Sequence, residues 1–208
     1  MELFELKKHF VIIIIVLFTC SCSNNPLNTS NQNEDEESEQ KVEYYTDDNL
    51  DFRQTTWGMS REQVINIEET EPVFMSEKKI DYEAKMMGMD SKIGYTFNNN
   101  ELVRTSFFPL SKHQNKNDYI EIYNQIQKNL KQKYGKTVID TVQHKDPTIE
   151  IRPEDYGNAA CRGDLLFATQ WDLPRSDVQL LLRGEDGECM ISVIYISEEG
   201  FRQMLKNR

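Results

Sequence analysis

The sequence predicts an α+β fold in which two similar modules, each a helix followed by about four antiparallel strands, form one body. Two observations predict it. A helix start signal precedes residues 61–69, apolar residues recur at helical spacing over 117–134, and short runs of alternating apolar and polar residues follow each of these segments. The order of elements therefore repeats, which places the two modules at about residues 51–110 and 117–208 within a globular part of residues 51–208.

The first 22 residues have the features of an export signal. Lys7 and Lys8 precede an unbroken apolar run, Phe10 to Phe18. A helix that spans a bilayer needs about 20 apolar residues. The shorter run has the length of the apolar centre of a signal peptide.

Two cysteines follow this run directly. Cys20 and Cys22 make the segment resemble a bacterial lipoprotein signal, in which cleavage occurs before a cysteine that becomes lipid-modified. Ser21, before Cys22, is small, as the peptidase of that family requires. Thr19, before Cys20, is bulkier, although Leu17 fits the third position upstream of that cysteine. We favour Cys22 and keep Cys20 as the alternative. The resemblance implies an exported protein attached to a membrane by acyl chains such as palmitate, without a spanning helix.

Residues 23–50 are predicted to be a disordered, acidic tether. They are rich in Asn, Ser, Gln and Glu and almost without aliphatic residues, so they cannot bury enough apolar surface to fold. They hold eight acidic residues and one base, Lys41, which favours a self-repelling spacer over a cation site. The net charge of the whole chain is −11, which argues against nucleic acid as a partner.

The first helix has a start signal. With Ser60 as N-cap, Gln63 completes a capping box, and Met59 and Val64 have the spacing of a hydrophobic staple. These signals predict a short helix from about Arg61 to Glu69.

The strands of the first half follow that helix. Residues 80–87 and 92–97 alternate between apolar and polar, and the chain returns as a strand over Leu102 to Phe108. Asn98-Asn99-Asn100 is a turn sequence that tolerates positive φ and joins the last two strands as a hairpin.

The second half begins with the clearest helix of the chain. Apolar residues recur every three or four positions between Asn117 and Tyr134, and Gly135 stands at the expected C-terminal cap. The predicted strands are Thr137 to Val142, Leu165 to Leu173, Val178 to Arg183 and Met190 to Ile196, with a turn at Asp186-Gly187 and a closing helix over Ser197 to Lys206.

The start of the first helix carries a second resemblance. Gly58-Met59-Ser60-x-x-Gln63-Val64, ahead of an antiparallel sheet, resembles the small secreted and lipid-anchored modules typified by the beta-lactamase inhibitor protein and by small outer-membrane assembly lipoproteins. Those families continue to a Leu-Gly-x-Pro turn, which Glu69-Thr70-Glu71-Pro72 matches at the proline alone. The resemblance implies a helix-on-sheet binding domain and carries no ligand across.

Motifs of catalysis and metal binding are missing from the sequence. Beyond the signal the histidines are His113 and His144, and neither stands at a metal-ligand spacing. No nucleophile elbow, phosphate loop or dinucleotide motif occurs. We therefore predict no catalytic residues, no metal and no cofactor.

Cys161 and Cys189 are candidates for a disulfide, because an exported domain meets an oxidising environment. In the predicted sheet they lie near the starts of two strands that flank the strand Val178 to Arg183. A bond would then have to cover about 10 Å, whereas the Cα atoms of a disulfide lie within about 7 Å. It would require the predicted loop Gly157 to Gly163 to fold over the intervening hairpin, so both outcomes stay open.

Trp57 is a candidate binding aromatic. Beside the helix start it either packs under the cap or forms the exposed aromatic of a binding face, whereas Trp171 is expected in the core. Together these features predict a non-enzymatic, lipid-anchored module in the cell envelope that binds a protein or another envelope component. The alternatives are an envelope hydrolase with an unrecognised site and a structural factor in envelope assembly.

Overall fold

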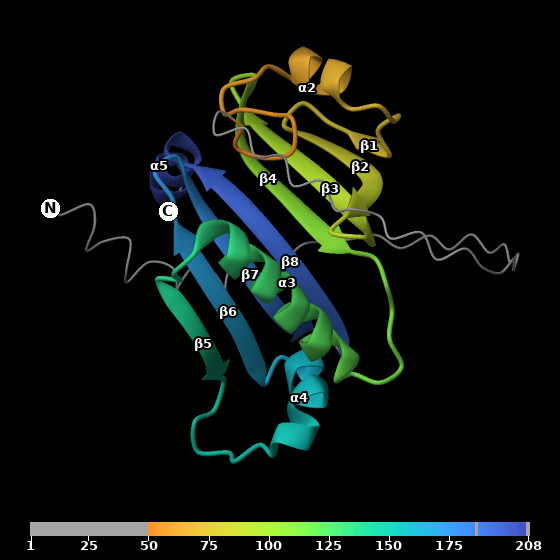
Figure 1. The fold of residues 1–208 in the computed structure, drawn as a ribbon, viewed down its shortest axis with the longest axis vertical. Coiled ribbons are helices and arrows are strands. Elements are labelled where there is room, and N and C mark those ends of the chain that lie inside the picture. Colours follow the sequence, from red (N-terminus) through yellow and green to blue (C-terminus); the bar gives the residue numbers. More distant parts are fainter. Residues whose placement is uncertain (1–49, 186, 207–208) are drawn as a thin grey trace, which may run out of the picture. The chain divides into compact units, whose positions relative to one another are not determined.

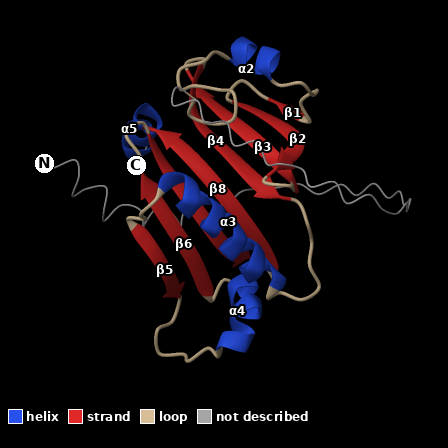
Figure 2. Cartoon of the chain, viewed as in Figure 1, coloured by secondary structure: helices blue, strands red, loops and turns tan. Residues whose placement is uncertain are grey.

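The described part of the chain has an α+β fold built on one antiparallel sheet. A computed structural model describes residues 50–206 except residue 186 (Figure 1). The predicted signal at 1–22, with Cys20 and Cys22, and the predicted tether up to residue 49 lie outside the described residues. Four α-helices accompany the sheet: α2 (Arg61–Ile67), α3 (Asp118–Tyr134), α4 (Tyr156–Arg162) and α5 (Glu198–Lys206) (Figure 2).

The sheet has eight strands in the order β1-β2-β3-β4-β8-β7-β6-β5, and the neighbouring strands are antiparallel. Their bounds are β1 (Phe74–Met75), β2 (Lys79–Met86), β3 (Met89–Asn98), β4 (Glu101–Pro109), β5 (Ile139–His144), β6 (Leu165–Asp172), β7 (Ser176–Glu185) and β8 (Glu188–Ser197). The strands predicted from alternation are therefore present, with ends that differ by a few residues. The pairing of β4 with β8 joins the strands before and after α3 into one sheet.

The capping box predicted for the first helix is present. The side chain of Ser60 accepts a hydrogen bond from the backbone of Gln63, and the side chain of Gln63 accepts one from the backbone of Ser60. The helix ends at Ile67, earlier than predicted, because Glu68 is extended. The Glu68 carboxylate instead accepts a hydrogen bond from the Tyr95 hydroxyl and pairs with Arg53 at 3.3 Å, so a tertiary contact ends the helix.

The second predicted helix is confirmed as α3. Its buried residues recur at the expected spacing, and Gly135 follows it with φ 74°. The helix crosses the second half of the sheet in Figure 1. Its buried side chains join one core with the apolar residues of β6, β7 and β8, including Phe167, Leu180 and Val193.

The predicted loop Gly157 to Gly163 is wrong, because residues 156–162 form α4. This short helix is rich in small residues, and tertiary packing sets it in place. A Cβ atom on Gly157 would collide with the backbone of Lys116 and Asn117 ahead of α3. Asn117 accepts a hydrogen bond from the Gly157 N–H at 2.9 Å. Local propensity carries none of this information.

The two faces of the sheet differ in character. Three contacts show which face the helices cover. Glu68, just after α2, accepts a hydrogen bond from Tyr95 of β3, and Tyr123 of α3 is hydrogen-bonded to Thr169 of β6. Cys161 of α4 forms a disulfide with Cys189 of β8. All of these strand residues point to one face, so α2, α3 and α4 lie on that face.

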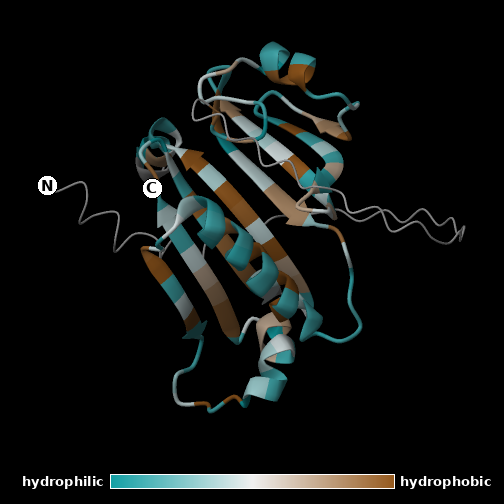
Figure 3. Ribbon diagram, in the orientation of Figure 1, coloured by the Kyte–Doolittle hydropathy of each residue, from teal (hydrophilic) through white to brown (hydrophobic). Residues whose placement is uncertain are grey.

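Side chains alternate along each strand, so the intervening residues point to the opposite surface. Figure 3 shows this alternation as apolar and polar bands along the strands. We call the opposite surface the polar face. Its centre is the row of paired residues Asp81, Gly94, Ser106, Ile194, Gln179 and Gln170.

Candidate functional site

A groove of about 350 Å³ lies beside Trp57. Its walls come from four places in the chain: the segment before α2, the start of β4, the turn between β6 and β7, and the first turns of α5. The lining residues that matter below are Trp57, Glu101, Arg175, Glu198, Glu199 and Arg202. An aromatic ring and charged groups of both signs therefore meet in one concave surface, which is the usual form of a binding site.

Trp57 is held in the wall of this groove by two hydrogen bonds. Its indole N–H donates to the hydroxyl of Ser176 at 2.9 Å, and its backbone N–H donates to the Asp51 carboxylate at 2.8 Å. The residue is half-buried. The structure therefore has a feature of each position considered for Trp57. The indole N–H is hydrogen-bonded inside the protein, and another part of the residue lines the groove.

Asp51 ties the groove together. Its side chain is only 5% exposed and accepts a hydrogen bond from the Arg175 guanidinium at 2.8 Å. Burial raises the pKa of Asp51 above its ordinary value, although the Trp57 N–H and Arg175 act in the opposite direction. The segment before α2 is thereby fastened to the turn between β6 and β7, more than a hundred residues away in the chain.

The far wall of the groove carries the charges of α5. Arg202 lies 2.8 Å from the Glu198 carboxylate and 3.5 Å from that of Glu199. Each of these side chains is about half exposed. The described residues that line the groove offer an aromatic ring for stacking and charged groups for hydrogen bonds and ion pairs.

His113 has neighbours that the sequence did not reveal. In the loop between β4 and α3, its Nε2 atom lies 3.0 Å from the Ser111 hydroxyl, and its Nδ1 atom lies 3.6 Å from the Asp118 carboxylate. The ring also packs edge-on against Tyr119 at 5.1 Å. The order of these groups is that of a serine nucleophile, its base and an orienting acid. The spacing Ser-x-His-x-x-x-x-Asp matches no known motif, so no sequence signal marks the cluster.

His144 ends β5 at the edge of the sheet and is half-buried. Among the residues that the structure describes, 50–185 and 187–206, no group of three or more His, Cys, Asp or Glu side chains is arranged to hold a metal ion.

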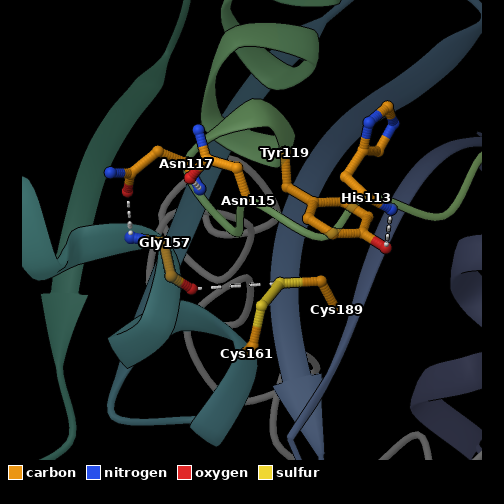
Figure 4. The surroundings of a disulfide bond; sticks show 7 residues. All are labelled: His113, Asn115, Asn117, Tyr119, Gly157, Cys161 and Cys189. Atoms are coloured by element: carbon orange, nitrogen blue, oxygen red, sulfur yellow. Dashed lines mark hydrogen bonds between the residues drawn. A yellow bond between two sulfur atoms is a disulfide. The ribbon is translucent and has the colours of Figure 1, made fainter.

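Cys161 and Cys189 form a disulfide with their Cα atoms 4.4 Å apart (Figure 4). The distance expected from the sequence assumed that Cys161 stood near the start of a strand. It stands in α4 instead, and this helix packs against β6, β7 and β8. Cys161 thus crosses above β7 to reach Cys189 on β8, which removes the geometric difficulty.

No protein-family model, curated protein or solved structure matches this chain. A helix long and apolar enough to cross a membrane does not occur in the part of the chain that the structure describes.

Proposed function

We propose that this protein is a non-enzymatic binding module that is exported and held at a bacterial membrane by lipid on Cys22, with Cys20 as the alternative. Two features support export. The apolar run and cysteines at the N-terminus have the order of a lipoprotein signal. The Cys161–Cys189 disulfide is the kind of bond that persists outside the cytoplasm.

The body consists of two similar modules in this proposal, residues 51–110 and 117–208. The strand order supports it, because β1 to β4 are neighbours in sequence order and the second half follows the reverse order from β8 to β5. A helix precedes the strands in each half, and the last strands of the two halves pair with each other. The second half departs from the first by the insertion of α4 between β5 and β6.

The partner is a protein or another envelope component, and it binds at the Trp57 groove. The observation that carries this proposal is the indole of Trp57, fixed through Ser176 in the wall of a groove that is lined by charged residues from distant parts of the chain. Aromatic residues held rigidly at the centre of a binding surface supply much of the energy of protein recognition.

Photo-cross-linking in intact cells tests this function. A photoreactive amino acid replaces Glu101 at the groove or, as a control, Glu121, an exposed residue of α3 outside the groove. We expect a specific cross-linked product from position 101 that weakens at least tenfold when Trp57→Leu is added. Equal products from both positions, or no effect of Trp57→Leu, would contradict the groove as the binding site.

One observation favours a second candidate, an envelope hydrolase that uses Ser111, His113 and Asp118. In that reaction the Ser111 oxygen attacks an acyl carbonyl while His113 Nε2 accepts the hydroxyl proton. His113 then gives the proton to the leaving group, and water releases the acyl enzyme. Against it, the distance from His113 Nδ1 to Asp118 exceeds that of a hydrogen bond, and Ser111 is exposed.

A fluorophosphonate probe, which labels activated serines, separates the two candidates. The binding module predicts no labelling beyond that of a Ser111→Ala variant. Labelling that disappears in Ser111→Ala and in His113→Ala establishes the hydrolase instead. The third alternative, a structural factor in envelope assembly, predicts a cross-linking pattern that does not depend on Trp57.

A further inference from the structure

The Trp57 groove has an exposed carboxylate close to its aromatic residue. The backbone N–H of Gly58 donates to the Leu102 carbonyl at 2.9 Å, and the N–H of Leu102 donates to the Met59 carbonyl at 2.9 Å. These two bonds pair the residues that follow Trp57 with the residue that follows Glu101. Both Trp57 and Glu101 line the groove. Backbone pairing therefore places them at adjoining positions of its wall.

Two more carboxylates come from the first turn of α5. Gly200 lets this helix approach β4 closely, because a Cβ atom there would lie 2.5 Å from the Val103 carbonyl oxygen. The helix contacts both β4 and β8. It thereby holds Glu198 and Glu199 at the edge of the groove, next to the strand that carries Glu101. The three carboxylates are thus positioned by packed elements of the fold.

Negative charge exceeds positive charge at this groove. Arg175 is paired with the buried carboxylate of Asp51, and Arg202 is shared by the two carboxylates of α5. Glu101 is exposed and has no ion-pair partner among the described residues. Among the described lining residues and Asp51, four carboxylates face two guanidinium groups, which is a net charge of −2. The start of the α5 dipole offsets only about half a charge. The groove therefore favours a cation.

Trp57 adds a second attraction for a cation. Its indole N–H is engaged by the Ser176 hydroxyl at 2.9 Å, so a ligand in the groove meets the π-system of the ring. The faces of this system are negative, and tryptophan is the aromatic side chain that attracts cations most strongly. A guanidinium suits the groove better than an ammonium, because it is planar, stacks on aromatic rings and donates two parallel hydrogen bonds to a carboxylate.

The size of the groove limits what enters it. Its volume of about 350 Å³ lies at the lower end of the range for ligand sites, about 300–1,000 Å³. This is room for one or two side chains. Leu102, Val103 and Pro174 also line the groove and provide apolar surface. A long basic side chain can lay its methylene groups on such a surface while its charged end reaches the carboxylates.

We propose that the Trp57 groove takes an arginine side chain that projects from the partner protein. Its guanidinium stacks on the Trp57 ring and donates hydrogen bonds to Glu101, while the carboxylates of α5 add to the attraction. Charge complementarity between the groove and this side chain supports the choice of occupant. The inference rests on the proposed function, in which the partner binds at this groove, and it names the group that enters.

Titration with pentapeptides tests the inference directly. The full chain in detergent carries ¹⁵N at its tryptophans, and Trp57→Phe assigns the Trp57 indole signal. We expect a capped peptide with arginine at its centre and glycine elsewhere to shift this signal saturably. The matching lysine peptide should bind at least threefold more weakly, and the glutamate peptide should not bind. Affinity for the arginine peptide should fall at least fivefold in Glu101→Gln and stay unchanged in Glu121→Gln, an exposed control on α3.

Cross-linking in cells separates this inference from the proposed function. A photoreactive amino acid replaces Pro174, an exposed residue of the groove, so that Glu101 can be varied. We expect the cross-linked product to be lost in Trp57→Leu and weakened at least fivefold in Glu101→Gln. A product that depends on Trp57 but not on Glu101 would leave the groove as the binding site and overturn the arginine.

The peptide titration has its own contrary results. No saturable shift with the arginine peptide, or an equal shift with the glutamate peptide, would overturn the inference whatever the cross-linking shows. A cross-linked product that does not depend on Trp57 contradicts the proposed function instead, and the titration then still decides whether the groove takes arginine.

Discussion

Gly184 of β7 lies directly against the carbonyl group of Cys161 in α4. A Cβ atom at Gly184 would overlap the carbonyl carbon and oxygen of Cys161 and the carbonyl oxygen of Ala160. This close approach lets the end of α4 pass over β7 and reach the next strand, where Cys161 bonds to Cys189. A glycine in one strand therefore permits a disulfide to another.

Gly184→Ala should destabilise the protein by about 2 kcal/mol, because the added methyl group must push α4 away from the sheet. Urea denaturation measures the loss. The control is Glu188→Ala, an exposed position on β8, which should change stability by less than about 0.5 kcal/mol. Equal stabilities of the two variants would show that α4 does not rest on Gly184.

Removal of the Cys161–Cys189 disulfide should lower the free energy of unfolding by more than Gly184→Ala does. The bond closes a loop with a sequence separation of 28 residues, for which chain entropy predicts about 3.5 kcal/mol. We expect Cys161→Ala/Cys189→Ala, and the parent protein in reductant, to unfold at similarly lowered urea concentrations. Two free thiols in the exported protein, detected by mass spectrometry without reductant, would contradict the bond.

Trp57→Phe should lower the free energy of unfolding by about 1 kcal/mol, because the Ser176 hydroxyl stays buried but loses the indole N–H that donates to it. The double-mutant cycle with Ser176→Ala isolates the hydrogen bond from the change in packing. A coupling energy near zero would mean that the contact does not hold the ring. The same Trp57→Phe variant keeps an aromatic in the groove and serves as a conservative partner to Trp57→Leu in binding assays.

Asp51 should make stability depend on pH in the acid range. Its pKa is raised in the folded protein, so the native state holds this proton more tightly than the unfolded chain does. That contribution is complete below the ordinary value of 3.8 and is lost as the pH rises through the folded pKa. As the pH is increased from 3 to 6, the parent loses this contribution and Asp51→Asn does not. The urea midpoint of Asp51→Asn should therefore rise relative to that of the parent over this range. Parallel pH profiles would exclude a role for Asp51.

Lipid attachment is tested by radiolabelled palmitate in a bacterial host. We expect label in the parent and in Cys20→Ser, and none in Cys22→Ser. Label lost in Cys20→Ser and kept in Cys22→Ser moves the site to Cys20. Label that persists when both cysteines are serine would reject the lipoprotein assignment.

Much of the fold was predictable because it depends on short stretches of chain. Residues close in sequence set the capping box at Ser60 and the spacing of apolar residues along α3. They also set the turn at Asn99 and Asn100, where both residues have positive φ. Alternation marked the longer strands for the same reason. The two-residue strand β1 was not located, since Phe74 and Met75 show no alternation.

The candidate sites were much less predictable. Trp57 stood out as an aromatic beside a helix cap, but Ser176 and Arg175, which complete its surroundings, lie more than a hundred residues further along the chain. The three residues around His113 are close in sequence, yet their alignment depends on loop conformation.

The sequence by itself determined the helices that carry start and stop signals, the longer strands and the turns, because side-chain periodicity and capping act over a few residues. The tertiary structure decided the rest. It paired β4 with β8, made a helix of residues 156–162, brought Cys161 over β7 and joined Trp57 to Ser176. Each of these depends on the packing of segments distant in the chain, where shape and register, and not local propensity, set the free energy.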